Sequence, residues 1–149
     1  MYFDSSALLS LFVKRKFSSQ INEFVHKQNQ AIRIWSFGVV EIHSALKQMA
    51  RVGEITENQR ISIIREIDYQ RSMGNIIVEE QIESKKVHDL AVLLIEKPEF
   101  KGKALDTIHV ASALILGESI FASTDIKQRE LATREGLNVQ PSKLILNKE

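Results

Sequence analysis

The sequence predicts an α/β protein, a three-layer α/β/α sandwich with a mostly parallel central sheet. Short apolar segments typical of buried strands alternate with longer segments of helical periodicity, in the order β-α-α-β-α-α-β-α-α-β-α-β. Strands connected through helices usually run parallel, and the helices then cover both faces of the sheet. With 149 residues, of which 44% are hydrophobic, the chain can bury one core, so we expect a single domain over residues 1–149.

The first half of the chain begins with a short apolar strand and continues with two helices, a second strand and a long helix. Alternation of apolar and polar residues predicts the second strand, whereas apolar spacing and the following Gly53 predict the long helix. The predicted ranges are strands over residues 1–3 and 31–35, and helices over residues 6–14, 18–28 and 37–51.

The second half continues this alternation. Thr56 and Gln59 have the spacing of a capping box, which predicts a helix start, and Pro98 separates two later helices because proline does not continue a helix. The predicted ranges are strands over residues 76–79, 120–123 and 137–139, and helices over residues 56–73, 82–96 and 126–134, with a further helix that contains Asp106 and ends near Gly117.

Composition excludes several kinds of protein. The absence of cysteine removes disulfides, zinc–thiolate sites and cysteine nucleophiles. The apolar stretch of residues 7–13 is too short to span a bilayer, and the chain does not begin with a basic signal segment, so we expect a cytoplasmic protein with no membrane partner. Since the net charge is only +1, contact with nucleic acid would depend on local basic patches. The candidates are residues 14–16, Lys47 with Arg51, Lys97 with Lys101 and Lys103, and Lys127 with Arg129.

Four carboxylates, those of Asp4, Glu41, Asp106 and Asp125, interrupt or directly follow apolar segments, where a solvated charge is not normally placed. Two of them follow strands and two lie in the first turns of helices, so all four can face the edge of the sheet at which functional residues gather in open α/β folds. Carboxylates brought together repel one another unless a divalent cation lies between them. Oxygen ligands favour Mg²⁺ or Mn²⁺, so the pattern predicts a site for one of these ions.

Each acid also has a structural interpretation. Asp4 and Asp125 could cap the helices that follow them. Glu41 lies beside an apolar stripe, where a carboxylate requires a partner. His109 is a candidate ligand, although a histidine on a packed helix is more often a hydrogen-bonded core residue. The motifs of nucleotide-binding loops, dinucleotide sites, serine hydrolases and HExxH zinc enzymes are absent.

Four segments, taken together, resemble the motifs of the PIN domain family, in particular the VapC-like toxins of prokaryotic toxin–antitoxin pairs. Each segment contains one of the four acids, and the resemblance covers almost the whole chain. The third is the most specific, and its Thr107 stands where the family often has alanine. The segments are residues 2–8, 36–42, 105–114 and 122–125.

The resemblance implies a hydrolase, a metal-dependent endoribonuclease that cuts RNA phosphodiester bonds as the toxin of such a pair. By this resemblance the four acids form the catalytic site and hold one or two Mg²⁺ or Mn²⁺ ions, with Ser6 and Thr124 in support through their hydroxyl groups. Hydrolysis assisted by a metal ion needs no protein nucleophile. The resemblance also implies a homodimer and an antitoxin protein that covers the acidic pocket. Apolar residues that could form the dimer interface, although a core role is favoured, are Leu11, Phe12, Phe24, Ile63, Ile64 and Ile67.

Other functions stay open on the sequence. An orphan or housekeeping PIN nuclease, or a non-catalytic module that binds Mg²⁺ or RNA, would contain the same residues. A phospho-receiver also places an acid after its first strand, but Asp4 is not part of an acidic pair and the third strand ends in two glutamates. A haloacid-dehalogenase-like phosphatase would require an aspartate where Ser6 stands.

Overall fold

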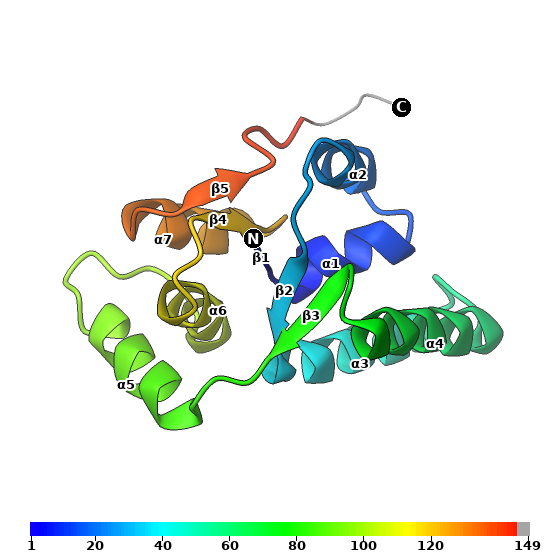
Figure 1. The fold of residues 1–149 in the computed structure, drawn as a ribbon, viewed down its shortest axis with the longest axis horizontal. Helices are drawn as coiled ribbons and strands as arrows, with labels where there is room; N and C mark the ends of the chain where they lie inside the picture. The colour runs from blue at the N-terminus through cyan, green and yellow to red at the C-terminus, as the bar shows by residue number, and fades with distance from the viewer. Residues whose placement is uncertain (146–149) are drawn as a thin grey trace.

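The computed structural model describes residues 1–145 and contains a five-stranded sheet between two groups of helices (Figure 1). The strand order is β3-β2-β1-β4-β5, and all neighbouring strands in this sheet are parallel. The predicted α/β/α sandwich is therefore confirmed. The strands are β1 (Tyr2–Phe3), β2 (Ile32–Trp35), β3 (Ile77–Glu80), β4 (Ile120–Ala122) and β5 (Asn138–Gln140).

Helices α1 to α4 lie on one side of the sheet and α5 to α7 on the other (Figure 1). All of them lie where the sequence predicts a helix, with ends that differ by a few residues. Within residues 1–145, no helix has the length and apolar character needed to cross a membrane. The bounds are α1 (Ser5–Phe12), α2 (Ser18–His26), α3 (Ser36–Arg51), α4 (Glu57–Met73), α5 (Ser84–Ile95), α6 (Ala104–Ile115) and α7 (Ile126–Arg134).

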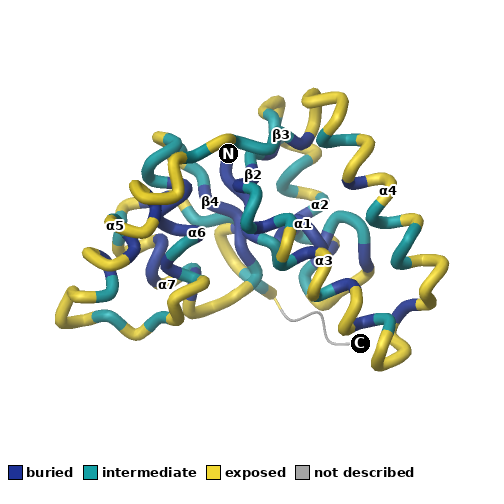
Figure 2. Tube along the Cα trace, turned by 90° about the horizontal axis from the view of Figure 1, so that it is seen from below, coloured by how far each residue is buried: buried dark blue, intermediate teal, exposed yellow. Residues whose placement is uncertain are grey.

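Two apolar cores lie on opposite faces of the sheet, because successive side chains along a strand point to opposite faces. Phe3 and Ile34 pack among α1 to α4, whereas Tyr2 and Phe121 pack among α5 to α7. Figure 2 shows the central strands buried and much of α4 and α5 exposed. The apolar residues considered for a dimer interface all pack in or against the first core, which favours their core role: Leu11, Phe12, Phe24, Ile63, Ile64 and Ile67.

Helix α4 shows how the sequence sets its own boundaries. Thr56 Oγ1 accepts a hydrogen bond from the Gln59 amide at 3.2 Å, and Gln59 Oε1 accepts one from the Thr56 amide at 2.7 Å. This is the predicted capping box. At the other end Gly74 has φ of 63°, a left-handed conformation that favours glycine.

The topology brings the loops of the predicted site to one edge. Strand β1 lies between β2 and β4, with Phe3 paired to Ala122, and the Asp4 amide donates to the Ala122 carbonyl at 3.1 Å. The first residues after β1 and β4 are therefore adjacent. Strand β2 leads directly into α3, which carries Glu41.

Leu8 tests this packing, because its side chain is fully buried in α1. We expect Leu8→Ala to lower the free energy of unfolding by about 2–5 kcal/mol through lost burial and a residual cavity. Urea unfolding measures the change. As a matched control, Leu93→Ala removes the same atoms from a residue that is 65% exposed, and it should change the free energy by less than about 0.5 kcal/mol. Equal losses in the two variants would contradict the packing of α1.

Candidate active site

Asp4 is a buried carboxylate at the junction of β1 and α1, with a side chain that is 2% exposed. Its Oδ1 accepts a hydrogen bond from the Ala7 amide at 2.7 Å and so caps α1. The Ser6 hydroxyl donates to the same carboxylate, at 2.8 Å from Oδ1 and 2.9 Å from Oδ2. Burial raises the pKa of Asp4, although His109 and the neutral hydrogen-bond donors around the carboxylate oppose this effect.

Ser6 connects the loops that follow β1 and β4. Besides donating to Asp4, its hydroxyl oxygen accepts a hydrogen bond from the Thr124 amide at 3.0 Å. The next residue, Asp125, is exposed and caps α7, since its Oδ1 accepts from the amides of Lys127 and Gln128 at 2.9 and 3.1 Å. Ser6 therefore contacts Asp4 through its hydroxyl group. Thr124 contacts Ser6 through its backbone amide, and not through the hydroxyl that the sequence suggested.

Asp106 lies in the first turn of α6, half-buried, and its Oδ2 accepts a hydrogen bond from the Lys103 amide at 3.2 Å. Burial raises the pKa of Asp106, and the negative charge of Asp125 adds to this rise. The two carboxylates, at the starts of the consecutive helices α6 and α7, therefore act on one another electrostatically.

Glu41 projects from α3 and is hydrogen-bonded to Nε2 of His109 on α6. On the other side of the imidazole ring, Nδ1 lies 2.8 Å from the hydroxyl of Tyr2, which is fully buried in β1. A chain of contacts thus joins the middle strand of the sheet to α6 and then to α3. The sequence predicted that the Glu41 carboxylate requires a partner without naming one, and the structure identifies this partner as His109. His109 is a buried, hydrogen-bonded residue on a packed helix, the role that the sequence favoured for it.

The hydrogen-bond directions in this chain follow from its chemistry. An ionised carboxylate only accepts, so His109 donates through Nε2–H to Glu41. In a neutral imidazole Nδ1 is then an acceptor, and the Tyr2 hydroxyl donates to it. Burial raises the pKa of Tyr2, so this hydroxyl keeps its proton. No buried side-chain nitrogen or oxygen within residues 1–145 lacks a hydrogen-bond partner.

The acids lie at one edge but do not form a ready-made metal cage. Within the part of the chain that the structure describes, no three histidine or acidic side chains are grouped closely enough to hold a metal ion. Three of the acids are hydrogen-bonded to helix N-termini and the fourth to His109. The donor set is nevertheless of the kind that Mg²⁺ and Mn²⁺ use, and the buried Asp4, surrounded by neutral donors, is the acid that a cation would benefit most.

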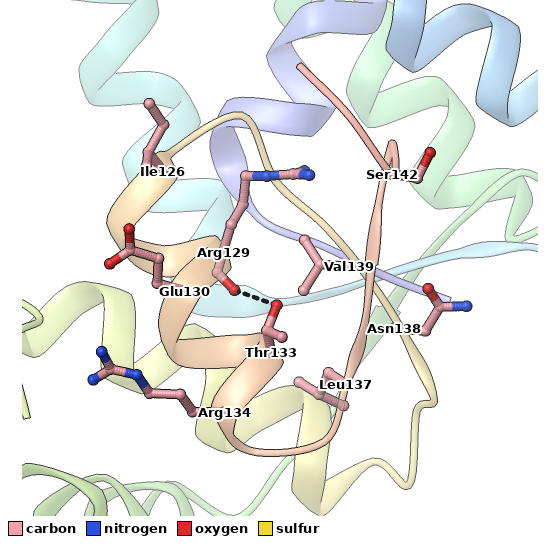
Figure 3. Close-up of a pocket in the computed structure, with 9 residues that line it drawn as sticks. All are labelled: Ile126, Arg129, Glu130, Thr133, Arg134, Leu137, Asn138, Val139 and Ser142. Atoms are coloured by element: carbon pink, nitrogen blue, oxygen red, sulfur yellow. Dashed lines mark hydrogen bonds between the residues drawn. The ribbon is translucent and has the colours of Figure 1, made fainter. Parts of the chain in front are cut away.

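Arg129, predicted as part of a basic patch with Lys127, is instead a structural residue. Its guanidinium donates to the carbonyls of Ser123, Gln140 and Pro141, at 2.8, 3.0 and 2.5 Å, and so ties the end of β4 to the end of β5. Burial lowers the pKa of Arg129. A pocket between α7 and β5 includes this arginine (Figure 3), but none of the four acids lines it.

Comparison with solved structures identifies the fold. The chain is similar to the crystal structure of Mycobacterium tuberculosis VapC20, which is described as a toxin that cleaves the sarcin–ricin loop. The TM-score is 0.67, with 9% sequence identity, over 92% of this chain and 95% of that chain. No protein-family model matches the sequence, and no curated protein matches it either. The structural likeness confirms the VapC-like PIN fold that the four motifs predicted.

Tyr2→Phe tests the chain of contacts, because it keeps the ring stacked on Phe121 and removes the donor to His109. We expect the free energy of unfolding to fall by about 1–3 kcal/mol, the cost of a buried polar group without its partner. Urea unfolding measures it. Tyr69→Phe, at a residue that is 57% exposed, is the matched control and should cost less than about 0.5 kcal/mol. Indistinguishable stabilities would show that the Tyr2 hydroxyl does not bind His109.

Asp4→Asn tests the burial of the carboxylate. Because the folded-state pKa of Asp4 is raised, the folded protein binds more protons than the unfolded chain, and stability falls as pH rises from about 4 through the raised pKa. In EDTA we therefore expect the variant to melt at a higher temperature than wild type at pH 7 to 8, with a difference that shrinks toward pH 4. Thermal melts over this range measure it. The exposed Asp89→Asn should show no such trend, and the same trend in both would contradict the assignment.

Proposed function

We propose that this protein is a Mg²⁺- or Mn²⁺-dependent endoribonuclease and the toxin of a toxin–antitoxin pair, with residues 1–149 forming one nuclease domain. The observation that carries the proposal is the buried Asp4 at the end of β1, beside the loop that carries Asp125. Asp4 caps α1, but an uncharged cap such as serine would do so without the cost of burying an ionisable group. The likeness of the fold to VapC20, which is described as an RNA-cleaving toxin, supports ribonuclease chemistry.

In this proposal the four acids hold the metal ion and Ser6 orients Asp4. A bound Mg²⁺ or Mn²⁺ would supply Lewis acidity at the scissile phosphate. Asp106 and Asp125 would lose their mutual repulsion when the ion binds, which makes them a natural pair of ligands. Glu41 would join them by exchanging its bond to His109 for a bond to the ion, while Tyr2 keeps the imidazole ring in place.

The partners in this proposal are an RNA substrate, an antitoxin protein and a second copy of the chain, in the cytoplasm. VapC20 is described as cleaving one ribosomal RNA loop, and we extend to this chain only the chemical class of that substrate. Exposed apolar residues beside the acids suit an antitoxin that covers the site. Val40 and Leu105, 63% and 47% exposed, line the hollow next to Glu41.

Two observations favour a second candidate function, an RNA-binding protein without catalysis. Glu41 is hydrogen-bonded to His109, and no three metal-binding side chains are grouped within residues 1–145. In such a protein the acids would serve as helix caps and structural partners. The nuclease cuts RNA and requires the negative charge of its carboxylates, whereas the RNA-binding protein does neither.

Asp106→Asn separates the two. The amide can still accept the hydrogen bond from the Lys103 backbone, so the helix keeps its capping interaction while the negative charge is lost. We expect cleavage of a total RNA pool to fall at least about 100-fold, because stabilisation of charge by the metal ion is worth several kcal/mol. Cleavage by purified, partner-free protein in Mg²⁺ or Mn²⁺, followed by sequencing of the new ends, measures the loss.

The matched control is Asp89→Asn, an exposed aspartate that pairs with Lys85 on α5, away from the acids. It should cut RNA like wild type, and EDTA should stop both proteins. Cleavage that continues in EDTA or in Asp106→Asn would exclude the proposed chemistry. RNA binding without any cleavage by the metal-loaded wild type would instead support the second candidate.

A further inference from the structure

Some basic side chains of this protein are paired with carboxylates and others, including Arg65 on α4, form no ion pair within residues 1–145. Most of those on the strands and outer helices form ion pairs with carboxylates, and these are Lys27, Arg33, Arg60, Arg71, Lys85, Lys86 and Lys97. By contrast, Arg15, Lys16 and Arg51 are exposed and form no ion pair within residues 1–145. All three lie close to the predicted site.

These free cations line two hollows, each of which contains one of the four acids. The first, of about 330 Å³, is lined by Arg15, Lys16 and Asp125 among others. The second, of about 870 Å³, is lined by Glu41 and Arg51. Both volumes lie within or near the range of about 300–1,000 Å³ typical of small-ligand sites, so each hollow has room for a nucleotide.

The two hollows flank the N-terminus of α1. Ser5 lines the larger hollow and Ser6 the smaller one, and Asp4 directly precedes both serines. The N-terminus of α1, which Asp4 caps, therefore lies between the two hollows, and Glu41 and Asp125 each line one of them. A ligand that occupied both hollows would cross the acidic edge.

The contacts of Lys16 and of a fourth cation, Lys47, bear on how these side chains could meet an anion. The Lys16 ammonium lies over the ring of Phe17, 5.5 Å from its centroid, on the wall of the smaller hollow. Lys47, in the larger hollow, shares Glu57 with Arg60, and its 3.5 Å distance to that carboxylate is longer than the 2.6 Å of the arginine. Because Arg60 already neutralises Glu57, Lys47 is available to an incoming anion.

We propose that the two hollows bind the phosphates that precede and follow the scissile phosphate of one RNA strand, with Arg15 and Lys16 on one side and Lys47 and Arg51 on the other. This inference rests on the proposed function and adds to it the path of the substrate. A single small anion could occupy one hollow but would not use both. A polyanion spans them, and its central phosphate then lies at the acids.

With a net charge of only +1, the protein as a whole has little electrostatic attraction for RNA, so binding would depend on local groups of cations. Each phosphate contact releases counterions. For a single strand, the slope of the logarithm of the binding constant against the logarithm of the salt concentration therefore becomes steeper by about 0.7 for every contact. The cations of the two hollows should therefore account for most of the salt dependence. A cation elsewhere on the surface should contribute little.

The test uses the full chain with Asp106→Asn, which removes cleavage, and a labelled single-stranded RNA of about 12 nucleotides, within the footprint of such proteins. Arg15→Gln, Arg51→Gln and Arg65→Gln are compared in this background by fluorescence anisotropy over a salt series. Arg65 is the matched control, since it is an exposed arginine on α4 that lines neither hollow. All three variants lose one charge from an exposed side chain, so their folds are comparable.

We expect Arg15→Gln and Arg51→Gln each to bind about fivefold more weakly at 0.1 M salt and to lower the salt slope by about 0.7, with Arg65→Gln unchanged. Equal RNA affinity of all three variants, or weaker binding by only one of Arg15→Gln and Arg51→Gln, would overturn the proposal that RNA occupies both hollows. The cations that do not affect RNA binding would then be assigned to another acidic partner. Failure of the Asp106→Asn protein to bind RNA would also overturn it. RNA cleavage by wild type is scored separately, so the proposed function can survive the loss of this inference.

Discussion

The burial of the Asp4 carboxylate at the end of β1 is the constraint on which the rest of the site depends. Strand β1 has two residues and lies between β2 and β4, so the residue that follows it is enclosed on both sides. Removing a carboxylate from water is costly unless a charge or several donors compensate. Ser6 and the α1 N-terminus supply the donors, but burial outweighs them and still raises the pKa of Asp4.

The fold could be predicted from local signals, because periodicity and turn chemistry act over a few residues. The capping box at Thr56 and the left-handed Gly74 fix α4 from the sequence alone. The order of strands is different in kind. Tyr2 pairs with Phe121 and Ile32 pairs with Ile77, and nothing in the spacing of apolar residues specifies which strands become neighbours. Only the rule that helices connect parallel strands limited the possibilities.

The site was predictable in its residues and less so in their partners. The four acids stand out because each breaks an apolar pattern, and the structure brings their segments to the same edge of the sheet; their metal-binding role stays a prediction. The bond between Glu41 and His109 joins residues 68 positions apart, and the Tyr2 bond joins residues 107 positions apart, so sequence spacing gives no sign of either. Arg129 was assigned to a basic surface patch because of its place in the sequence. In the structure its guanidinium instead donates hydrogen bonds to the backbone carbonyls of Ser123 and Gln140.

Helix capping and metal binding need not exclude one another here. Backbone amides donate hydrogen bonds to Oδ2 of Asp106 and to Oδ1 of Asp125. Within residues 1–145 the other oxygen of each carboxylate has no hydrogen-bond partner. A carboxylate has about four acceptor positions, and one backbone donor uses a single position. The helix N-terminus can therefore hold one oxygen while the other remains available to a cation. If these carboxylates bind a metal ion, the caps would hold them in a fixed orientation beforehand, which would reduce the entropy cost of binding.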